Sequence, residues 1–331
     1  MLISWNVTRE CNLFCRHCYR ESGPGRREPD ELTTGEGRQL LDQIKAAGFR
    51  LVIFSGGEPL LRKDLLELTA HAARIGLRPV LGTNGMLLGE ELARSLRESG
   101  VGGVAVSLDS DTPAYHDQFR NCPGAWEGAA RGIRNALAAG LRVQVNMTLS
   151  EANLDRFPAT VDRVAEWGVQ ALHPFFLVPT GRGRDLAAET LQREKYFGMI
   201  RTVLAKQQTV AIELKPTCAP QFLPMAREMG LALRFSRGCL AGTAYCCILP
   251  NGDVHICPYL PVKVGNVRTE PFDAIWRDNE IFQRLRDFGA YEGRCGSCPE
   301  IGSCGGCRAR AYYYHDGNYL AEEPWCYKGV S

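Results

Sequence analysis

Three cysteines near the start of the chain have the spacing of a cluster-binding site. Cys11, Cys15 and Cys18 are separated by three and by two residues. Three thiolates this close together can hold three irons of a four-iron cluster, and the fourth iron then keeps a coordination position for another ligand. The alternative is a zinc site completed by His17 or by a distant residue, which the ligand chemistry disfavours.

A second group of cysteines fills the last third of the chain. Five of its members follow one another as Cys295, Cys298, Cys304, Cys307 and Cys326, after an earlier Cys239 and Cys257. The five residues between the two Cys-x2-Cys pairs are too few for a zinc ribbon, in which about 15–20 residues separate the pairs. The spacing therefore favours iron–sulfur ligation, whereas the isolated Cys122 is read as a buried structural residue.

The composition restricts the function classes. The 331 residues carry a net charge of +2, with 45% hydrophobic and 23% charged residues and no long basic run, so neither nucleic acid nor an anionic membrane is expected as a partner. No apolar stretch approaches the ~20 residues of a membrane span, and the first residues lack the features of a signal peptide. Fourteen cysteines without an export signal predict a cytoplasmic protein with thiol ligands rather than disulfides.

The elements that must position these cysteines alternate between strands and helices. Strands are predicted at residues 2–7, 51–54, 78–81, 103–107, 142–147 and 171–176, with helices at 36–47, 64–75, 90–98, 126–139 and 154–167. Such alternation predicts an α/β fold with a parallel sheet. Because motifs follow nearly every strand, a partial (β/α)6 barrel of the TIM type is favoured over an open doubly wound sheet.

Three segments follow from this pattern. Residues 1–184 are predicted to form the partial barrel, residues 185–238 a helical linking segment, and residues 239–331 a small cysteine-rich domain built around metal. The residues Pro250-Asn251-Gly252-Asp253 predict a hairpin within the last segment.

The first cysteine group and the residues around it resemble the radical S-adenosylmethionine (SAM) superfamily. The triad is followed by Tyr19, and the second strand is followed by Gly56-Gly57-Glu58-Pro59. Glycines allow backbone carbonyls to approach a ligand closely, and Glu58 offers a carboxylate to an ammonium group. The resemblance implies that the cluster binds SAM and that residues 56–59 hold its amino group.

The same resemblance implies further SAM contacts at the ends of the strands, with Val178 beside the adenine and Arg120 on the carboxylate. The alternatives are helix caps and turn formers for the strand-end residues and a solvated surface position for Arg120. The remaining candidates are Tyr19, Thr83, Asn84, Ser107, Asp109 and Asn146.

The C-terminal cysteines resemble the SPASM extension of radical SAM proteins, although two residues rather than three precede Cys307. The resemblance implies two auxiliary [4Fe-4S] clusters. The first would be held by Cys239, Cys257 and Cys307, and the second by Cys295, Cys298, Cys304 and Cys326. For the fourth ligand of the first cluster Cys246 is the first choice and Cys247 the second, with Cys218 or an open iron as the remaining options.

Several sequence segments resemble the branch of SPASM-containing radical SAM proteins that makes heme d1 and that makes heme from siroheme. These segments are residues 3–8, 176–182, 215–221, 237–242 and 304–312. This resemblance implies removal or decarboxylation of carboxylate side chains of an iron tetrapyrrole by a 5′-deoxyadenosyl radical. Guanidinium groups suit propionates, so the substrate candidates are Arg182, Arg184, Arg308 and Arg310. The alternative is that these arginines pair with acids or balance cluster charge.

Aromatic and metal-binding side chains complete the substrate hypothesis. Tyr312, Tyr313 and Tyr314 could line the macrocycle, and His173, His315 or Cys218 could bind its iron. Reduced flavodoxin or ferredoxin is expected as the electron donor. Two rival classes are a SPASM enzyme that modifies peptides and a multi-cluster electron carrier, and the open three-cysteine site disfavours the second.

Overall fold

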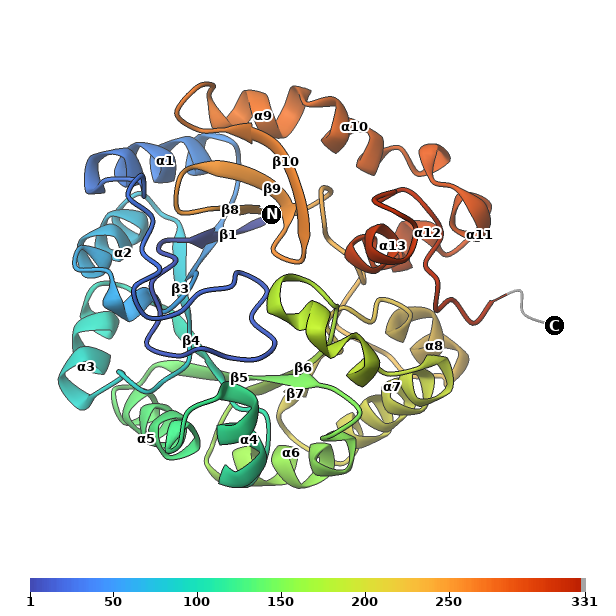
Figure 1. Ribbon diagram of the computed structural model, residues 1–331, viewed down its shortest axis with the longest axis horizontal. Coiled ribbons are helices and arrows are strands. Elements are labelled where there is room, and N and C mark those ends of the chain that lie inside the picture. Colours follow the sequence, from blue (N-terminus) through green and yellow to red (C-terminus); the bar gives the residue numbers. More distant parts are fainter. Residues whose placement is uncertain (329–331) are drawn as a thin grey trace.

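Ten strands form a single curved sheet in the computed structural model, which describes residues 1–328 (Figure 1). The strand order is β10-β9-β8-β1-β2-β3-β4-β5-β6-β7, and the two ends of the sheet are not joined. All neighbours from β8 to β7 are parallel, whereas β9 and β10 are antiparallel additions. The strands are β1 (Leu2–Asn6), β2 (Leu51–Ser55), β3 (Arg78–Thr83), β4 (Gly103–Ser107), β5 (Arg142–Leu149), β6 (Ala171–Phe176), β7 (Glu213–Leu214), β8 (Tyr245–Ile248), β9 (Asp253–Cys257) and β10 (Leu260–Asn266).

The helices ring the outside of the sheet in Figure 1. They are α1 (Thr34–Ala46), α2 (Leu65–Arg74), α3 (Glu90–Glu98), α4 (Pro113–Arg120), α5 (Ala125–Ala138), α6 (Phe157–Glu166), α7 (Arg193–Gln207), α8 (Phe222–Glu228), α9 (Phe272–Asp278), α10 (Glu280–Arg286), α11 (Gly293–Gly296), α12 (Ile301–Cys304) and α13 (Arg308–Tyr314). Helix α13 packs on β10 and α12 packs on α8, so the cysteine-rich end lies on the open side of the sheet.

Alternation along the strands separates the core from the interior of the sheet. In β5, Val143, Val145 and Met147 are fully buried, whereas Gln144 and Asn146 line the interior cavity. Helices cover the buried set because their apolar residues recur every three or four positions, as Ala129, Ile133 and Ala136 do in α5. The alternate positions, whose side chains face the interior of the sheet, can therefore carry polar residues that contact a ligand.

The six predicted strands and the predicted hairpin are confirmed. Each strand begins where expected and ends within two residues of the expected position, and β8 and β9 flank the predicted turn. Helix α4 was not predicted, and the predicted helix at 154–167 begins with a 3-10 turn before α6 starts at Phe157. The sheet is a partial barrel that stays open.

The join between the barrel and the cysteine-rich segment was not anticipated. Strand β8 pairs in parallel with β1, so that Ile3 lies opposite Cys246 and Ser4 opposite Cys247. The hairpin of the last segment thus extends the sheet of the first. The exact boundaries of the three predicted segments stay a prediction, and residues 329–331 of the last one lie outside the described residues.

Candidate active site

A cavity of about 770 Å³ lies inside the curved sheet. Cys11, Cys15 and Cys18, on the loop after β1, line it. The inner faces of the strands contribute small residues such as Gly82 and Ala105, whereas closed barrels of this kind fill their interior with bulky branched side chains. The three cysteines therefore open into a chamber with the volume of a typical ligand site.

The turn after β2 packs directly against the segment that leads to the cysteine loop. The backbone N–H of Gly57 donates to the Thr8 carbonyl and that of Glu58 to the Glu10 carbonyl, both at 2.8 Å. A β-carbon at Gly57 would lie 2.0 Å from the Glu10 oxygen, and one at Gly56, where φ is +133°, would lie 2.4 Å from the Thr8 oxygen. Only glycine fits both positions, so this turn sets the position of the cysteine loop.

The Glu58 carboxylate is buried beneath the cavity. It accepts hydrogen bonds from the Thr83 hydroxyl at 2.8 Å, from the Asn84 backbone N–H at 2.9 Å and from the Leu60 N–H at 3.2 Å. Burial raises its pKa to about 7, although these hydrogen bonds oppose the shift. A carboxylate with this pKa is half charged near neutral pH, and a nearby ammonium group would favour its charged form. The contact with the SAM amino group stays a prediction.

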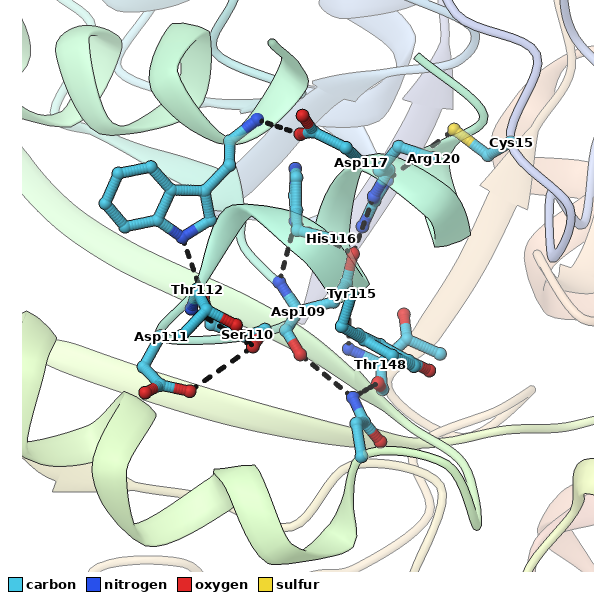
Figure 2. Close-up of polar contacts among 12 residues, drawn as sticks. Cys15, Asp109, Ser110, Asp111, Thr112, Tyr115, His116, Asp117, Arg120 and Thr148 are labelled. Carbon is cyan, nitrogen blue, oxygen red and sulfur yellow. Dashed lines mark hydrogen bonds and ion pairs between the residues drawn. The ribbon is translucent and has the colours of Figure 1, made fainter. Parts of the chain in front are cut away.

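Arg120 joins the cysteine loop to β4 (Figure 2). Its Nε donates to the Asp109 carboxylate at 2.7 Å, and its Nη1 lies 3.9 Å from the Cys15 sulfur. Burial raises the pKa of Asp109, but Arg120 and His116 outweigh this effect and hold the pKa well below its usual range. Arg120 is 8% exposed and lines the cavity. It is therefore a buried cation beside a cluster thiol, not a solvated surface residue.

Most other predicted SAM contacts also border this cavity. Asp109 and Pro59 do not line it: Asp109 is held by Arg120, and Pro59 begins a 3-10 turn. The Tyr19 hydroxyl donates to Asn6 at 3.2 Å. The residues that do line the cavity are Tyr19, Gly56, Gly57, Thr83, Asn84, Ser107, Arg120, Asn146 and Val178.

Backbone N–H groups point at several of the cysteine sulfurs. Leu13 donates to Cys11 at 3.4 Å and Tyr259 to Cys257 at 3.3 Å. Glu323 donates to Cys295 at 3.3 Å. Hydrogen bonds of this kind stabilise thiolates and tune the reduction potential of the clusters they hold. The donor set and its surroundings thus fit iron–sulfur ligation.

Four further cysteines line the cavity: Cys218, Cys239, Cys257 and Cys307. A hydrogen bond from the Cys218 thiol lowers the pKa of Cys307, against the effect of burial. The charge of Cys307 in turn contributes to the raised pKa values of Cys239 and Cys257. Cys218 adopts a left-handed backbone, with φ at +60°, and this conformation costs energy for a residue with a β-carbon.

Cys246, the first choice for the fourth ligand, lies elsewhere. It is fully buried in β8 and packs in the hydrophobic core, while its neighbour Tyr245 lines the cavity. The reason is the alternation of side chains along a strand. Cys247, the second choice, is also fully buried, and its sulfur accepts a hydrogen bond from Asn6 at 3.5 Å. The geometry thus brings Cys218, not Cys246, to this cysteine set.

The second predicted cysteine set is close together in space. Burial is the largest cause of the raised pKa of Cys304, and the charges of Cys295 and Cys326 add to it. The raised pKa of Cys326 has the same main cause, with contributions from Cys295 and Cys298. These four residues are the set expected from the resemblance.

Comparison with known families agrees with this geometry. The family model of the radical SAM superfamily matches residues 5–164, and an iron–sulfur cluster-binding domain, SPASM, matches residues 239–308. An AdoMet-dependent heme synthase of Oleidesulfovibrio alaskensis is 39% identical over 98% of this chain and 86% of its own. The chain belongs to the radical SAM superfamily. It is an enzyme that uses SAM and a [4Fe-4S] cluster, and its SPASM domain holds further iron–sulfur clusters.

Other radical SAM relatives are similar to this protein over nearly its whole length. An Fe-coproporphyrin III synthase of Methanosarcina barkeri is 33% identical over 98% of this chain and 87% of its own. A mycofactocin maturase of Mycobacterium ulcerans is 32% identical over 94% of this chain and 84% of its own. The crystal structure of Streptococcus suis SuiB bound to S-adenosylmethionine has a TM-score of 0.76 at 16% identity, over 98% of this chain and 77% of that one, which supports the fold.

Two of the predicted substrate arginines contact cysteine-bearing segments, Arg182 the loop after β1 and Arg308 the C-terminal segment. Arg182 donates from Nε to the Cys15 carbonyl and from Nη2 to the Ser22 carbonyl, both at 2.8 Å. Arg308 donates from Nη1 to the Ala321 carbonyl at 2.8 Å, and its Nη2 lies 3.6 Å from the Cys295 sulfur. Both residues line the cavity, but these partners occupy much of each guanidinium. The contacts favour the alternative in which the arginines balance cluster charge.

Arg310 and Arg184 lie apart from the main cavity lining. Arg310 is fully buried and pairs with Glu323 at 3.0 Å, which also fits the alternative. Arg184 is exposed and lines a smaller cavity of about 200 Å³ together with Tyr312 and Tyr313. This smaller cavity shares Val178, Tyr259 and Ala309 with the main one. Tyr314 is 40% exposed and packs against Trp325.

The histidines proposed for the substrate iron are separated. His173 lines the main cavity, where its Nε2 lies 3.4 Å from the Glu213 carboxylate. His315 lies at the end of α13, outside the lining of either cavity. Lys215, the first residue of the segment 215–221 but not one of the predicted site residues, also lines the main cavity. The two-residue strand β7 is too short for a periodicity signal, although Glu213 and Lys215 have the spacing of one strand face.

Within residues 1–328, no helix combines the length and the apolar composition needed to cross a lipid bilayer.

Proposed function

We propose that this radical SAM enzyme removes or decarboxylates a propionate or acetate side chain of an iron tetrapyrrole. The observation that carries the proposal is the charge of the main cavity. Among the described residues, its lining contains six cationic side chains and one carboxylate, that of Glu213. Protein groups engage Arg120, Arg182 and Arg308, so the cations left for a ligand are Arg78, Arg142 and Lys215. A tetrapyrrole with several carboxylates complements this charge and the apolar lining around it.

The names of the relatives support the same substrate class. The AdoMet-dependent heme synthase and the Fe-coproporphyrin III synthase are each similar to this chain over 98% of its length. Three reactions fit this substrate class: conversion of propionates to vinyl groups, removal of acetates, and removal of propionates. Each gives a different change in the mass of the tetrapyrrole.

The chain's own residues hold the reacting groups. When bound, the cluster and SAM supply a 5′-deoxyadenosyl radical that takes a hydrogen atom from the substrate side chain. Cys11, Cys15 and Cys18 would hold the cluster, and the turn at residues 56–59 would hold SAM beside it. Arg120 keeps positive charge next to Cys15.

We propose Cys218, Cys239, Cys257 and Cys307 as the ligands of the first auxiliary cluster. All four line the cavity of the predicted SAM contacts. This cluster would therefore border the substrate and could accept an electron from it. Cys295, Cys298, Cys304 and Cys326 would hold the second cluster, farther along the SPASM domain.

We further propose a cytoplasmic location and reduced flavodoxin or ferredoxin as the electron donor. Cysteine thiolates that bind iron–sulfur clusters must stay reduced, which the cytoplasm favours. A low-potential donor is needed because the SAM cluster must be reduced before SAM is cleaved.

Peptide modification is the second candidate, and the observation that favours it is the 32% identity with the mycofactocin maturase. The lining of the cavity favours the tetrapyrrole, because its excess of cationic over anionic side chains suits a polycarboxylate better than an unspecified peptide.

The test is an anaerobic assay of the reconstituted, reduced holoenzyme with SAM. Didecarboxysiroheme, iron-coproporphyrin III and the heme-d1 precursor are supplied separately, and 5′-deoxyadenosine and the tetrapyrrole mass are followed by liquid chromatography–mass spectrometry. A loss of mass on one tetrapyrrole, coupled to 5′-deoxyadenosine, is expected. Formation of 5′-deoxyadenosine with all three tetrapyrroles unchanged would overturn the proposal and favour peptide modification.

A further inference from the structure

A belt of polar side chains crosses four neighbouring strands at one level of the cavity. Ser107 in β4 is opposite Asn146 in β5, and Asn146 is opposite His173 in β6. Leu214 in β7 is opposite Leu172, so Lys215 follows at the level of His173. The belt members all line the cavity. It therefore begins at two predicted SAM contacts and ends at Lys215.

The belt places Lys215 close to the reacting centre. Neighbouring strands lie about 4.8 Å apart, so the backbone of Lys215 is roughly 10 Å from that of Asn146, two strands away. A substrate that reaches Lys215 with one side chain would place its ring beside the predicted SAM site. The wall on the other side is apolar, with Leu51, Ile53 and Val80 on the inner faces of β2 and β3.

Lys215 has no carboxylate partner within 4.0 Å among residues 1–328. The nearest candidate by position, Glu213, directs Oε1 to His173 at 3.4 Å and Oε2 to Arg234 at 3.9 Å. The Lys215 ammonium lies instead 4.7 Å from the ring centre of Phe235. Burial lowers the pKa of this amine, and the charge of Glu213 opposes that shift only in part. A half-buried ammonium that forms no ion pair is incompletely compensated, and an anionic ligand would improve that compensation.

The other cations of the lining are less available for a ligand at this place. Arg120 is paired with Asp109, and Arg182 and Arg308 donate to backbone carbonyls. Arg78 and Arg142 are the first residues of β3 and β5, at the opposite end of the strands from the cysteine loop. Among the cations of the lining, Lys215 is thus the one that lies at the level of the predicted SAM contacts and forms no ion pair with a residue of the described chain.

We propose that the Lys215 ammonium binds a carboxylate side chain of the tetrapyrrole and so positions the ring for hydrogen abstraction. This assignment rests on the proposed function and names a residue that selects the substrate and sets its orientation. Lys215 is a positioning residue here, because the side chain it holds differs from the side chain that reacts.

The experiment measures ligand binding and coupling in the same holoenzyme preparations. Binding of iron-coproporphyrin III and of its tetramethyl ester is followed by absorbance for the wild type, Lys215→Met, Lys215→Gln and Lys215→Arg. Lys63→Met, which removes an exposed lysine outside the cavity lining, is the matched control. Iron content and the cluster spectra show whether each variant keeps its clusters. The ratio of 5′-deoxyadenosine to product reports how well the ring is positioned.

The neutral variants are expected to bind the free acid about 10- to 100-fold more weakly, the range for loss of a charge-assisted hydrogen bond. They should bind the tetramethyl ester as the wild type does, and they should form more 5′-deoxyadenosine per product. Lys215→Arg should recover much of the binding, and Lys63→Met should be unchanged.

If the wild type converts a tetrapyrrole but both neutral variants bind the free acid as tightly as the wild type does, the proposed role of Lys215 is wrong. The proposed function is unaffected by that result. Equal weakening toward acid and ester would also overturn the role of Lys215, because the effect would not depend on the carboxylates. A wild type that binds and converts no iron tetrapyrrole would overturn the proposed function and the role of Lys215 together.

Discussion

Cys218 borders the cavity and Cys246 does not, and substitution of each residue tests which of them binds iron. Cys218 lines the cavity with three other cysteines, whereas Cys246 packs in the core. We expect Cys218→Ser to lose or convert the first auxiliary cluster, with a changed electron paramagnetic resonance signal and less iron per chain. Cys246→Ser should keep the iron content of the wild type. Loss of iron in the Cys246 variant with full iron in the Cys218 variant would contradict the ligand set.

Glu58 should make SAM binding depend on pH near neutrality. Burial raises its pKa to about 7, so the carboxylate that attracts an ammonium group is fully present above pH 7 and is lost as the pH falls through 7. As the pH falls below 7, the dissociation constant of SAM should therefore increase, with a limiting slope of about tenfold for each pH unit. Glu58→Gln should bind SAM weakly and without this dependence. Calorimetry of the holoenzyme between pH 6 and 8.5 checks it, and a flat wild-type profile would contradict it.

At the residue scale, sequence reasoning found the short, glycine-rich and cysteine-rich positions better than the long side chains. Nine of the residues predicted to contact SAM line one cavity, and their contact with SAM stays a prediction. Arg182, Arg308 and Arg310 could not be placed, since a guanidinium at the end of a flexible chain takes its partners from segments distant in sequence. The fourth ligand of the first auxiliary cluster stays a prediction: the pairing of β8 with β1, which no local pattern indicated, places Cys246 outside the lining of the cavity that Cys218 borders.

At the scale of elements, the turn after β2 holds the cysteine loop by backbone contact. A β-carbon at Gly57 would lie 2.0 Å from the Glu10 oxygen, whereas one at Gly198 in α7 would meet nothing within 4 Å. We expect Gly57→Ala to move the loop, so that SAM cleavage falls at least tenfold while the auxiliary clusters stay loaded. Gly198→Ala should keep activity and gain about 0.5–1 kcal/mol of helix stability. Full SAM cleavage in Gly57→Ala would show that the contact is dispensable.

Long, periodic elements were predictable and short ones were not. The six strands of residues 1–176 carry buried runs bounded by turn residues, so their positions followed from the sequence. Strand β7 has two residues, and α11 and α12 have four each, which is too few for a repeating pattern. These short elements depend on tertiary contacts and, in the SPASM domain, on the cysteines around them.

At the scale of the whole molecule, one buried ion pair of the cysteine-rich segment contacts the linking segment before it. Arg310 in α13 donates to Glu323 at 3.0 Å and to the Cys218 carbonyl at 2.6 Å. Glu323 accepts the backbone N–H of Cys307 at 2.6 Å, and Tyr196 of α7 lies 4.8 Å from the guanidinium. The pair thus contacts two proposed ligands of the first auxiliary cluster at once.

Breaking this pair should destabilise the holoenzyme strongly. Glu323→Gln leaves the Arg310 charge buried without compensation, which costs about 3–5 kcal/mol, and its unfolding midpoint should fall by several degrees under anaerobic conditions. The double variant Arg310→Met/Glu323→Gln should lose less than the sum of the single variants, because the charges act as a unit. Removing the exposed Arg16–Glu189 pair is the control and should change the midpoint little. Additive losses would contradict the coupling.

The parallel pairing of β1 with β8 also has a consequence for synthesis on the ribosome. Strand β1 is made first, yet one of its two neighbours is completed only at Ile248. At typical elongation rates the chain needs roughly 10–50 s to reach that point. During that interval one edge of β1 has no partner, and unpaired strand edges are sites of aggregation. A chaperone that shields the nascent barrel, and iron–sulfur assembly that waits for the last third of the chain, would both follow from this single strand pairing.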